Sequence, residues 1–153
     1  MPTVNLDLLV AVAGHLRPLL NDIVFVGGCT TELLVTDPAA PSIRPTTDVD
    51  AMVEIASYAE YDHFSERLRK LGFHEDARPG APRCRWLIDD KQLDVMPTDE
   101  RILGFSNPWY KPAIASSQNT ELAPDLHIRV INAPYFVATK IVAFRGRERT
   151  ITE

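Results

Sequence analysis

The sequence predicts an α/β fold in which helices pack on a small mixed β-sheet. Helical spacing and strand alternation of apolar residues follow one another along the chain, and 45% of its 153 residues are hydrophobic. That length and content are sufficient for one buried core. Because no repeat or linker divides the sequence, we expect one domain that spans residues 1–153.

In the first half of the chain, helix and strand patterns alternate around a glycine pair. Apolar residues at helical spacing predict an opening helix over residues 6–20, which Pro18 should shorten or bend. The elements expected next are a strand over residues 22–26, a turn at Gly27 and Gly28, a short helix over 30–35, a proline-rich loop over 36–45, and a strand from Asp48 onward. A helix over residues 61–71 then faces the sheet, and Gly72 is its expected C-terminal stop.

In the second half, strand patterns come first and a helix comes last. The expected elements are strands over residues 73–75, 83–88 and 91–96, loops with one short strand near Ala113 over 98–125, a strand over 126–131, and a helix over about 133–147. Asp89 and Asp90 form the tight turn between the second and third of these strands. Pro134 suits the first turn of the last helix.

Three acidic residues lie where strand alternation points their side chains to the polar face. Asp48 and Asp50 lie opposite the apolar row that begins at Val49, and Asp94 faces away from its apolar neighbours. Asp48 and Asp50, two residues apart on one strand, lie close enough to bind one hard divalent cation, and without a cation their charges would repel. We therefore predict both as metal ligands, with a strand edge that carries solvated acids as the alternative. Asp94, presented from a later strand, is predicted as a third metal ligand.

The glycine pair follows a strand and precedes a helix. Such a turn allows close backbone approach at a helix N-terminus, where free amide groups favour a phosphate. We therefore predict that Gly27, Gly28 and Thr30 cradle phosphates, with an ordinary tight turn as the alternative. A phosphate cradle together with three metal-binding carboxylates is typical of phosphoryl or nucleotidyl transfer.

Two basic residues are candidates for binding those phosphates. Lys140 has only apolar neighbours on a helical wheel: Phe136, Val137, Ile141 and Phe144. An ammonium group on a buried apolar face needs an anion, unless its stem follows the core edge and the amine reaches water. Arg44, four residues before Asp48, can reach the phosphates or the metal-binding carboxylates, although a loop arginine is usually solvated.

Three segments of the sequence resemble the signatures of the DNA polymerase beta type of nucleotidyltransferases. They are residues 26–30 (Val-Gly-Gly-Cys-Thr), 44–50 (Arg-Pro-Thr-Thr-Asp-Val-Asp) and 93–95 (Leu-Asp-Val). The glycine turn, the form of the second motif, and the late segment over residues 133–145 (Ala-Pro-Tyr-Phe-Val-Ala-Thr-Lys-Ile-Val-Ala-Phe-Arg) resemble the AbiEii and MenT type toxin nucleotidyltransferases. The resemblance covers about residues 24–147.

The resemblance implies a polymerase beta-like nucleotidyltransferase fold and the transfer of a nucleoside monophosphate from a nucleoside triphosphate to an acceptor hydroxyl, with Mg²⁺ or Mn²⁺ as the cofactor. Asp48 and Asp50 would hold the cations, Asp94 would help to activate the acceptor, and Lys140 would neutralise the phosphates. The implied acceptor is RNA, above all a tRNA end, or a protein hydroxyl, with a small molecule as an open alternative. An antitoxin would then be a cognate partner.

A second class of function remains open at this point. The similar toxins continue past the lysine helix into a segment with a further catalytic Asp and more helices, whereas this sequence ends at Glu153. The expectation is therefore a minimal member of the family or one that lacks the usual C-terminal helical part. The alternative function is a non-catalytic nucleotidyltransferase-like domain that binds a nucleotide or a partner protein.

Composition and charge narrow the setting in which the protein is expected to act. A net charge of -5 argues against a chain that coats nucleic acid by bulk electrostatics. Cys29 and Cys84 fit neither a metal-ligand spacing nor a disulfide framework, which is typical of a reducing compartment. The sequence has no apolar run long enough to span a bilayer and no signal-peptide pattern. We expect a cytoplasmic protein with no membrane association.

Overall fold

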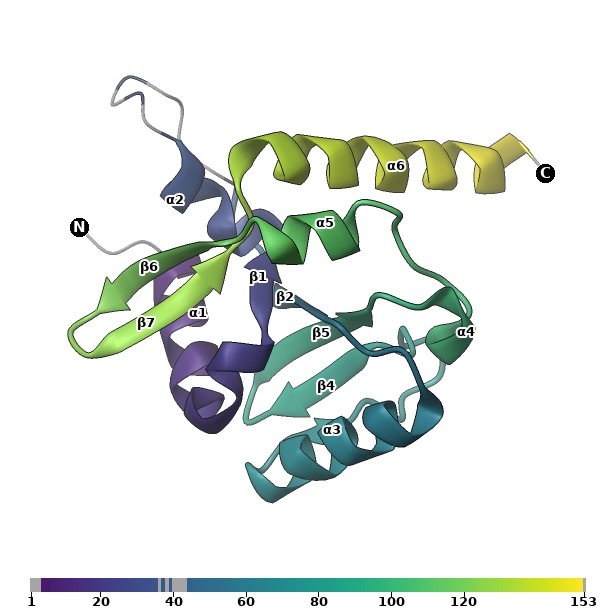
Figure 1. The fold of residues 1–153 in the computed structure, drawn as a ribbon, viewed down its shortest axis with the longest axis horizontal. Coiled ribbons are helices and arrows are strands. Elements are labelled where there is room, and N and C mark those ends of the chain that lie inside the picture. The colour runs from purple at the N-terminus through teal and green to yellow at the C-terminus, as the bar shows by residue number, and fades with distance from the viewer. Residues whose placement is uncertain (1–3, 36, 38, 40–43, 153) are drawn as a thin grey trace.

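A computed structural model describes residues 4–152 except 36, 38 and 40–43, and it describes side chains up to residue 146. Its centre is one seven-stranded mixed sheet with the order β3-β4-β5-β2-β1-β7-β6 (Figure 1). The strands are β1 (Val24–Val26), β2 (Asp48–Val53), β3 (His74–Glu75), β4 (Arg85–Ile88), β5 (Lys91–Pro97), β6 (Gln118–Ala123) and β7 (Leu126–Val130). The prediction of an α/β fold with a mixed sheet is confirmed.

Strand β2 lies in the middle of the sheet and joins its two halves. It pairs antiparallel with β1 and parallel with β5, and β1 in turn pairs parallel with β7. The register sets Asp50 beside Val26 on one side and beside Asp94 on the other. Residues far apart in the sequence therefore share one face of the sheet at this position.

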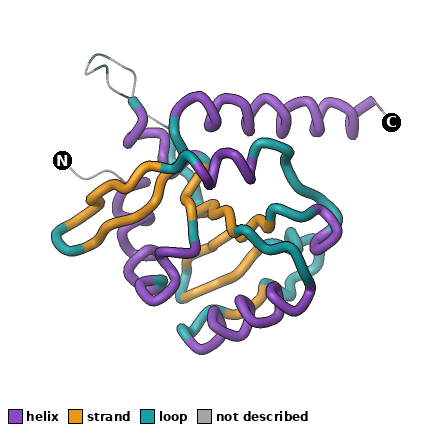
Figure 2. Tube along the Cα trace, viewed as in Figure 1, coloured by secondary structure: helices purple, strands orange, loops and turns teal. Residues whose placement is uncertain are grey.

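The helices cover the sheet on both faces (Figures 1 and 2). They are α1 (Val4–His15), α2 (Thr31–Leu34), α3 (Tyr58–Lys70), α4 (Glu100–Leu103), α5 (Tyr110–Ala115) and α6 (Ala133–Thr152), with 3₁₀ turns at Arg17–Asp22 and Gly28–Thr30. Helices α1 and α3 pack on the face that holds Val49 and Trp86, whereas α5 and α6 lie over the face that holds Asp50.

Helix α3 shows how local sequence sets the ends of an element. Ser57 caps its N-terminus, because the Ser57 hydroxyl accepts a hydrogen bond from the backbone N–H of Glu60 at 3.1 Å. The helix ends two residues before Gly72, which has a φ of +100°. Glycine adopts that left-handed conformation without strain, so the predicted stop at Gly72 is confirmed.

The core lies on both faces of the sheet: most of it fills the space under helices α1 and α3, whereas Met52 lies on the face that α5 covers. The largest fully buried side chains of the core are Trp86, Phe25, Phe73, Leu9, Leu16, Leu19, Ile23, Met52, Leu68, Leu93, Ile128 and Ile131. The apolar row predicted from residue 49 belongs to this core, since Val49 and Ala51 are fully buried. Burial of that row fixes which face of β2 its acidic residues occupy.

The region from residue 98 to 125 differs from its prediction. It contains helices α4 and α5 and strand β6, and Ala113 lies buried in α5 instead of in a short strand. Pro112 argues against a helix when the sequence is considered alone. A proline in the first turn, however, breaks no helical hydrogen bond. Strand β6 has no apolar alternation of its own and is held by its pairing with β7.

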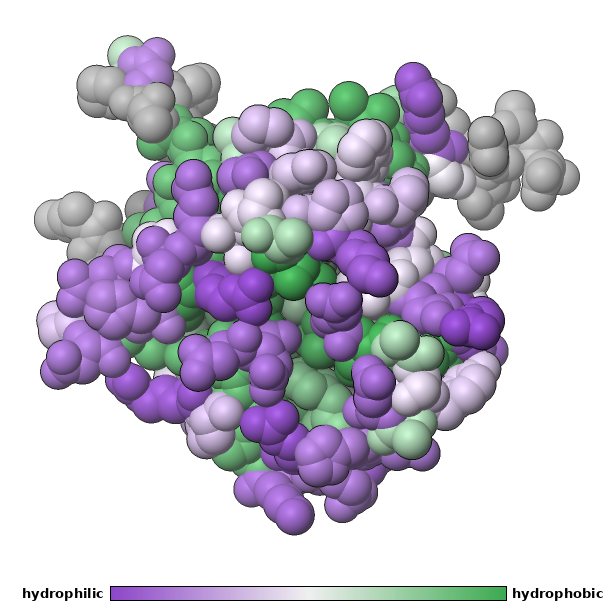
Figure 3. All heavy atoms as spheres, in the orientation of Figure 1, coloured by the Kyte–Doolittle hydropathy of each residue, from purple (hydrophilic) through white to green (hydrophobic). Residues whose placement is uncertain are grey.

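Helix α6 also differs from its prediction in the face that it buries. Val137, Ile141 and Phe144 are about half exposed, at 55%, 47% and 60%, and the buried residue of this stretch is Thr139. The Asn107 amide donates to the Thr139 carbonyl at 3.0 Å and fixes the rotation of the helix. Apolar surface is accordingly visible along the edge of the molecule where α6 runs (Figure 3).

Two further expectations concern the loops and the membrane. The proline-rich loop predicted over residues 36–45 lies partly outside the described residues, at 36, 38 and 40–43. Among the described residues, no helix combines the length and apolar character needed to cross a membrane.

Asn5 ties helix α1 to the segment that leads into β2, and its removal should weaken the fold. Its side-chain amide donates to the Arg44 carbonyl at 3.1 Å and its oxygen accepts from the Thr46 N–H at 2.9 Å. Because Asn5 is only 2% exposed, Asn5→Ala leaves two backbone groups without partners, and we expect a loss of roughly 1–3 kcal/mol.

Urea denaturation of the variant measures this loss. Asn119→Ala, at an exposed asparagine on β6, is the matched control and should change the unfolding free energy little. Equal losses in the two variants would contradict the bridging role of Asn5.

Candidate active site

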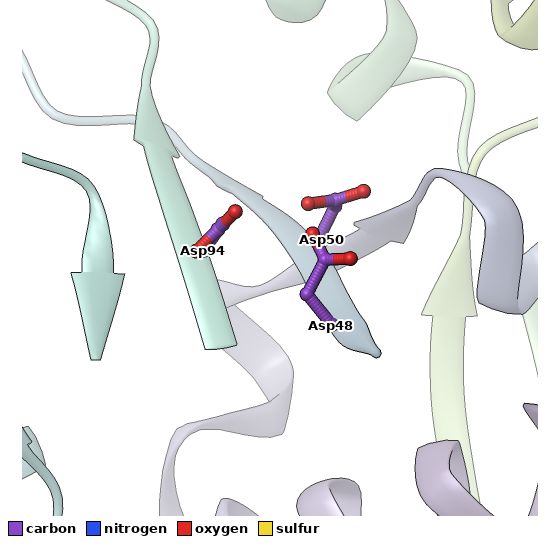
Figure 4. Close-up of side chains that lie close together, drawn as sticks. All are labelled: Asp48, Asp50 and Asp94. Carbon is purple, nitrogen blue, oxygen red and sulfur yellow. The ribbon is translucent and has the colours of Figure 1, made fainter. Parts of the chain in front are cut away.

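Three carboxylates meet on the face of the sheet that α5 and α6 cover. Asp48 and Asp50 come from β2 and Asp94 comes from β5 (Figure 4). One oxygen of each carboxylate lies within 4.8 Å of the others, and within the described residues no other group of three acids, cysteines or histidines is this close. The structure thus brings together the three residues that the sequence predicts as metal ligands.

The sheet itself places these side chains. Asp50 and Asp94 are direct partners in the parallel pairing of β2 with β5, and Asp48 lies two residues earlier on the same face. Thr46 holds the start of β2, since its hydroxyl donates to the Asp48 carbonyl at 2.8 Å and accepts from the Asp48 N–H at 3.2 Å. The positions of the carboxylates therefore depend on backbone pairing more than on side-chain contacts.

The electrostatics of the cluster favour a bound cation. Burial and the negative charges of Asp48 and Asp94 raise the pKa of Asp50 well above its ordinary value. Burial also raises the pKa of Asp94, although hydrogen bonds from Arg85 oppose this rise. Burial and mutual repulsion thus both disfavour three negative charges in this cluster. Closely spaced carboxylate oxygens are hard ligands, so the residues present fit Mg²⁺ or Mn²⁺.

Arg85 belongs to the site and was missed by the sequence interpretation. Its Nε donates to Asp94 Oδ1 at 2.9 Å and its Nη2 donates to Asp94 Oδ2 at 3.0 Å. The same Nη2 lies 4.0 Å from Asp48 Oδ2. A signal was present, because a two-residue turn at Asp89 and Asp90 sets Arg85 directly opposite Asp94 across the β4–β5 hairpin.

The glycine turn lies against the carboxylates. Gly27 has a φ of +85°, and a Cβ built on it would meet Asp50 Cγ at 2.9 Å. A Cβ on Gly28 would meet the Thr46 methyl group at 2.9 Å. Both positions therefore require glycine, because the turn lies too close to Asp50 and Thr46 for a Cβ atom. This requirement is separate from any contact of the turn with a phosphate.

Thr30 and Cys29 support this turn from inside. Thr30 is fully buried, and its hydroxyl donates to the Gly27 carbonyl at 2.8 Å. Its side chain therefore stabilises the turn and does not face the cavity. The Cys29 thiol donates to the Asp48 carbonyl at 3.3 Å, and burial raises its pKa to about 11, so it remains a thiol.

A cavity of about 200 Å³ opens beside Asp50 and the glycine turn. Its lining residues are Val26, Gly27, Gly28, Asp50, Met96, Tyr110, Thr139, Lys140 and Ala143. Burial, with a smaller contribution from the charge of Asp50, raises the pKa of Tyr110 to about 12, so this phenol stays protonated. The cavity thus combines a backbone turn, a carboxylate and a cationic side chain.

The two predicted basic residues differ in their placement. Lys140 lines the cavity, is exposed, and holds its ammonium 5.1 Å from the centre of the Phe136 ring. The expectation of a buried apolar face around it is wrong, because that side of α6 is exposed. Arg44 is also exposed, and its backbone carbonyl is held by Asn5.

A larger hollow of about 370 Å³ lies at the other end of β2, near Val53 and Ile55. The arginines that line this hollow make hydrogen bonds and ion pairs within the fold. Arg129 donates to the carbonyls of Asn21 and Ile114 at 2.8 and 3.1 Å, and Arg67 pairs with Asp22 at 3.1 Å. The cavity beside Asp50 is therefore the better candidate for chemistry, although it is smaller.

The fold has a counterpart among solved structures. An antigenic nucleotidyltransferase-like protein from Paracoccidioides brasiliensis is similar to this chain, with a TM-score of 0.60 and 18% sequence identity. The match covers 86% of this chain and 62% of that one, so this chain spans less than two thirds of the other protein's length. No family model and no curated protein matches the sequence. The likeness shows that the chain has a nucleotidyltransferase-like fold.

Asp50→Asn should stabilise the metal-free protein, because it removes one of three charges that repel. With EDTA at neutral pH we expect the melting temperature to rise by about 2–4 °C, which for a domain of this size corresponds to roughly 1 kcal/mol. The raised pKa of Asp50 sets the sign: its charge opposes folding as the pH rises above the ordinary carboxylate pKa. The difference should therefore vanish in acid.

The same melting experiment with Mn²⁺ should reverse the order of the two proteins. A cation that binds the folded site raises the melting temperature of the parent and leaves that of Asp50→Asn unchanged. Asp62→Asn, at an exposed acid on α3, should behave like the parent in both buffers. A lower melting temperature of Asp50→Asn in EDTA would contradict the repulsion argument.

Proposed function

We propose that this protein is a divalent-cation-dependent nucleotidyltransferase that moves a nucleoside monophosphate from a nucleoside triphosphate to an acceptor hydroxyl. The observation that carries the proposal is the meeting of Asp48, Asp50 and Asp94 beside a glycine turn. The nucleotidyltransferase-like fold supports it. Clustered carboxylates next to a backbone turn are what a triphosphate and its cations require.

The residues of the site have separate roles in this proposal. Asp48 and Asp50 would hold Mg²⁺ or Mn²⁺, which would neutralise the charge of the triphosphate and polarise its phosphorus. The backbone of Gly27 and Gly28 approaches the phosphates, Thr30 supports that turn, and Lys140 offsets phosphate charge from α6. Arg44, next to the segment held by Asn5, is a further candidate for phosphate contact.

The transfer step is a substitution at the α-phosphorus. The acceptor oxygen forms a bond to this phosphorus, the bond to the bridging oxygen of the β-phosphate breaks, and pyrophosphate leaves. The acceptor proton passes to Asp94. Although Arg85 binds both oxygens of Asp94, a carboxylate has about four lone-pair sites, so two remain for the acceptor.

The finer assignment follows from the sequence resemblance to AbiEii and MenT type toxins. By this resemblance the acceptor is RNA, above all a tRNA end, or a protein hydroxyl. An antitoxin is then the partner, and the cytoplasm is the location. A second candidate function is a non-catalytic domain that binds a nucleotide or a partner protein. The Arg85–Asp94 ion pair favours this candidate, because it occupies the carboxylate assigned to the acceptor.

Transfer of label from nucleoside triphosphates separates the two candidates. With Mg²⁺ and total RNA or protein as acceptors, we expect measurable transfer by the parent and none by Asp94→Asn. Triphosphate binding, measured by calorimetry, should persist in Asp94→Asn and be lost in Asp48→Asn and Asp50→Asn, because those two hold the cation. Asp62→Asn is the control.

Two outcomes would change the assignment. Intact metal-dependent triphosphate binding without transfer to any acceptor would reject the enzyme and favour the binding domain. Unchanged binding in Asp48→Asn and Asp50→Asn would show that these residues hold no cation.

Lys140→Met should weaken triphosphate binding and leave the fold intact, because the side chain lines the cavity and is exposed. A hydrogen bond to a charged group is worth roughly 1.5–3 kcal/mol, so we expect a loss of affinity of about 10- to 100-fold. Lys111→Met on α5, whose side chain is 75% exposed, is the matched control. Unchanged affinity together with a lower melting temperature would make Lys140 a structural residue.

A further inference from the structure

Arg85 is a cation that the fold itself places among the three carboxylates. It lies opposite Asp94 in the antiparallel pairing of β4 and β5, and Asp94 lies beside Asp50 in the parallel pairing of β5 and β2. Arg85, Asp94 and Asp50 thus form one row across three adjacent strands. The row is set by backbone register, so the guanidinium cannot leave the cluster without a change of its own rotamer.

The contacts of Arg85 differ from those of the surface ion pairs in this protein. It makes two hydrogen bonds to Asp94 at 2.9 and 3.0 Å and reaches to 4.0 Å from Asp48. The side chains of Arg85, Asp94 and Asp48 are 21%, 10% and 28% exposed. A bidentate pair so shielded from water is stronger than an exposed one, and separation of its partners leaves a buried charge.

The contact of Arg85 with Asp94 and Asp48 changes how negative charge is distributed over the site. Three carboxylates bring three negative charges, and Arg85 offsets one of them from the side of Asp94 and Asp48. The negative charge left without a protein partner is concentrated at Asp50 and the adjoining side of Asp48. A divalent ion is attracted to that side, whereas a second ion near Asp94 would meet a fixed positive charge.

Two-cation sites for phosphoryl transfer stabilise both the attacking and the leaving oxygen. We propose that Arg85 takes the place of one of these two cations, so that Asp48 and Asp50 hold a single divalent ion. The inference rests on the proposed function, because it concerns the same carboxylates. Arg85 is a positioning residue in this scheme: it holds Asp94 and neutralises it without touching the reacting atoms. Asp94 then serves the acceptor through its remaining lone pairs and binds no metal ion of its own.

Counting bound Mn²⁺ ions tests the proposal without any measurement of activity. Free Mn²⁺ gives an electron paramagnetic resonance signal that bound Mn²⁺ loses, so a titration gives the number of ions per chain. We expect one ion for the parent and two for Arg85→Met, which frees Asp94 and removes the repelling charge. The double variant Arg85→Met/Asp94→Asn should return to one ion. Arg85→Lys retains the charge and should also bind one.

The matched control is Arg101→Met. Arg101 also donates to both oxygens of an aspartate, Asp99, but this pair lies outside the three-carboxylate cluster. The substitution removes the same charge and frees a carboxylate in the same way, so it should leave the count at one ion. Thermal melting confirms that each variant is folded. If Arg85→Met does not fold, Arg85→Gln replaces it, because glutamine keeps one hydrogen bond and loses the charge.

The remaining results would overturn the proposal. Two ions in the parent would show that Arg85 excludes none. One ion in the parent and one in the folded Arg85 variant would show that Arg85 does not replace a cation, even if the variant binds its Mn²⁺ more tightly. Arg85 would then act only through its general electrostatic effect, and the proposed function would stay intact. No bound ion in either protein would overturn both the role of Arg85 and the metal site of the proposed function.

Discussion

Repulsion among three carboxylates is the constraint on which this site depends. Asp48, Asp50 and Asp94 lie within 4.8 Å of one another because β2 and β5 pair in a fixed parallel register, and the apolar row of β2 is buried on the opposite face. The sheet cannot relieve the repulsion by a small shift, since a slip of one residue would expose that row. Relief comes from the proton that the raised pKa of Asp50 favours, from Arg85, or from a cation.

The close approach of the glycine turn follows from the same pairing. Strand β1 runs antiparallel to β2, so the end of β1 reaches the start of β2, and Gly27 lies against Asp50. The Cys29 thiol donates to the Asp48 carbonyl and joins the two segments, whereas Thr30 and Thr46 each make a hydrogen bond within their own segment. A phosphate at the turn would therefore lie next to carboxylates that repel it. A phosphate can bind there only if a cation between the phosphate and the carboxylates offsets their repulsion. The position of the turn therefore supports the proposed metal site.

The elements and residue positions that depend on local periodicity could be predicted from the sequence. Alternation predicted that Asp48 and Asp50 share a face of one strand and that Asp94 faces away from the apolar neighbours of another. The pairing of β2 with β5 brings the three together; their functional roles stay predictions. Arg85 was missed because its position depends on hairpin register and not on its own strand. On α6, a helical wheel grouped Phe136, Ile141 and their neighbours correctly on one side. It could not show whether that side is covered, which depends on the packing of Asn107 against Thr139.

The placement of positive charge explains why three acids alone do not define the chemistry of the cavity. Arg85 approaches the cluster from β4 and is committed to Asp94, whereas Lys140 approaches from α6 and lines the cavity beside the glycine turn. The two side chains therefore serve different anions: one offsets a protein carboxylate, and the other is open to a ligand. Between them lies Asp50, whose negative charge neither side chain contacts directly in the described hydrogen bonds and ion pairs. That carboxylate is where a divalent ion would gain most, since burial and the charges of Asp48 and Asp94 raise its pKa more than the charge of Arg85 lowers it.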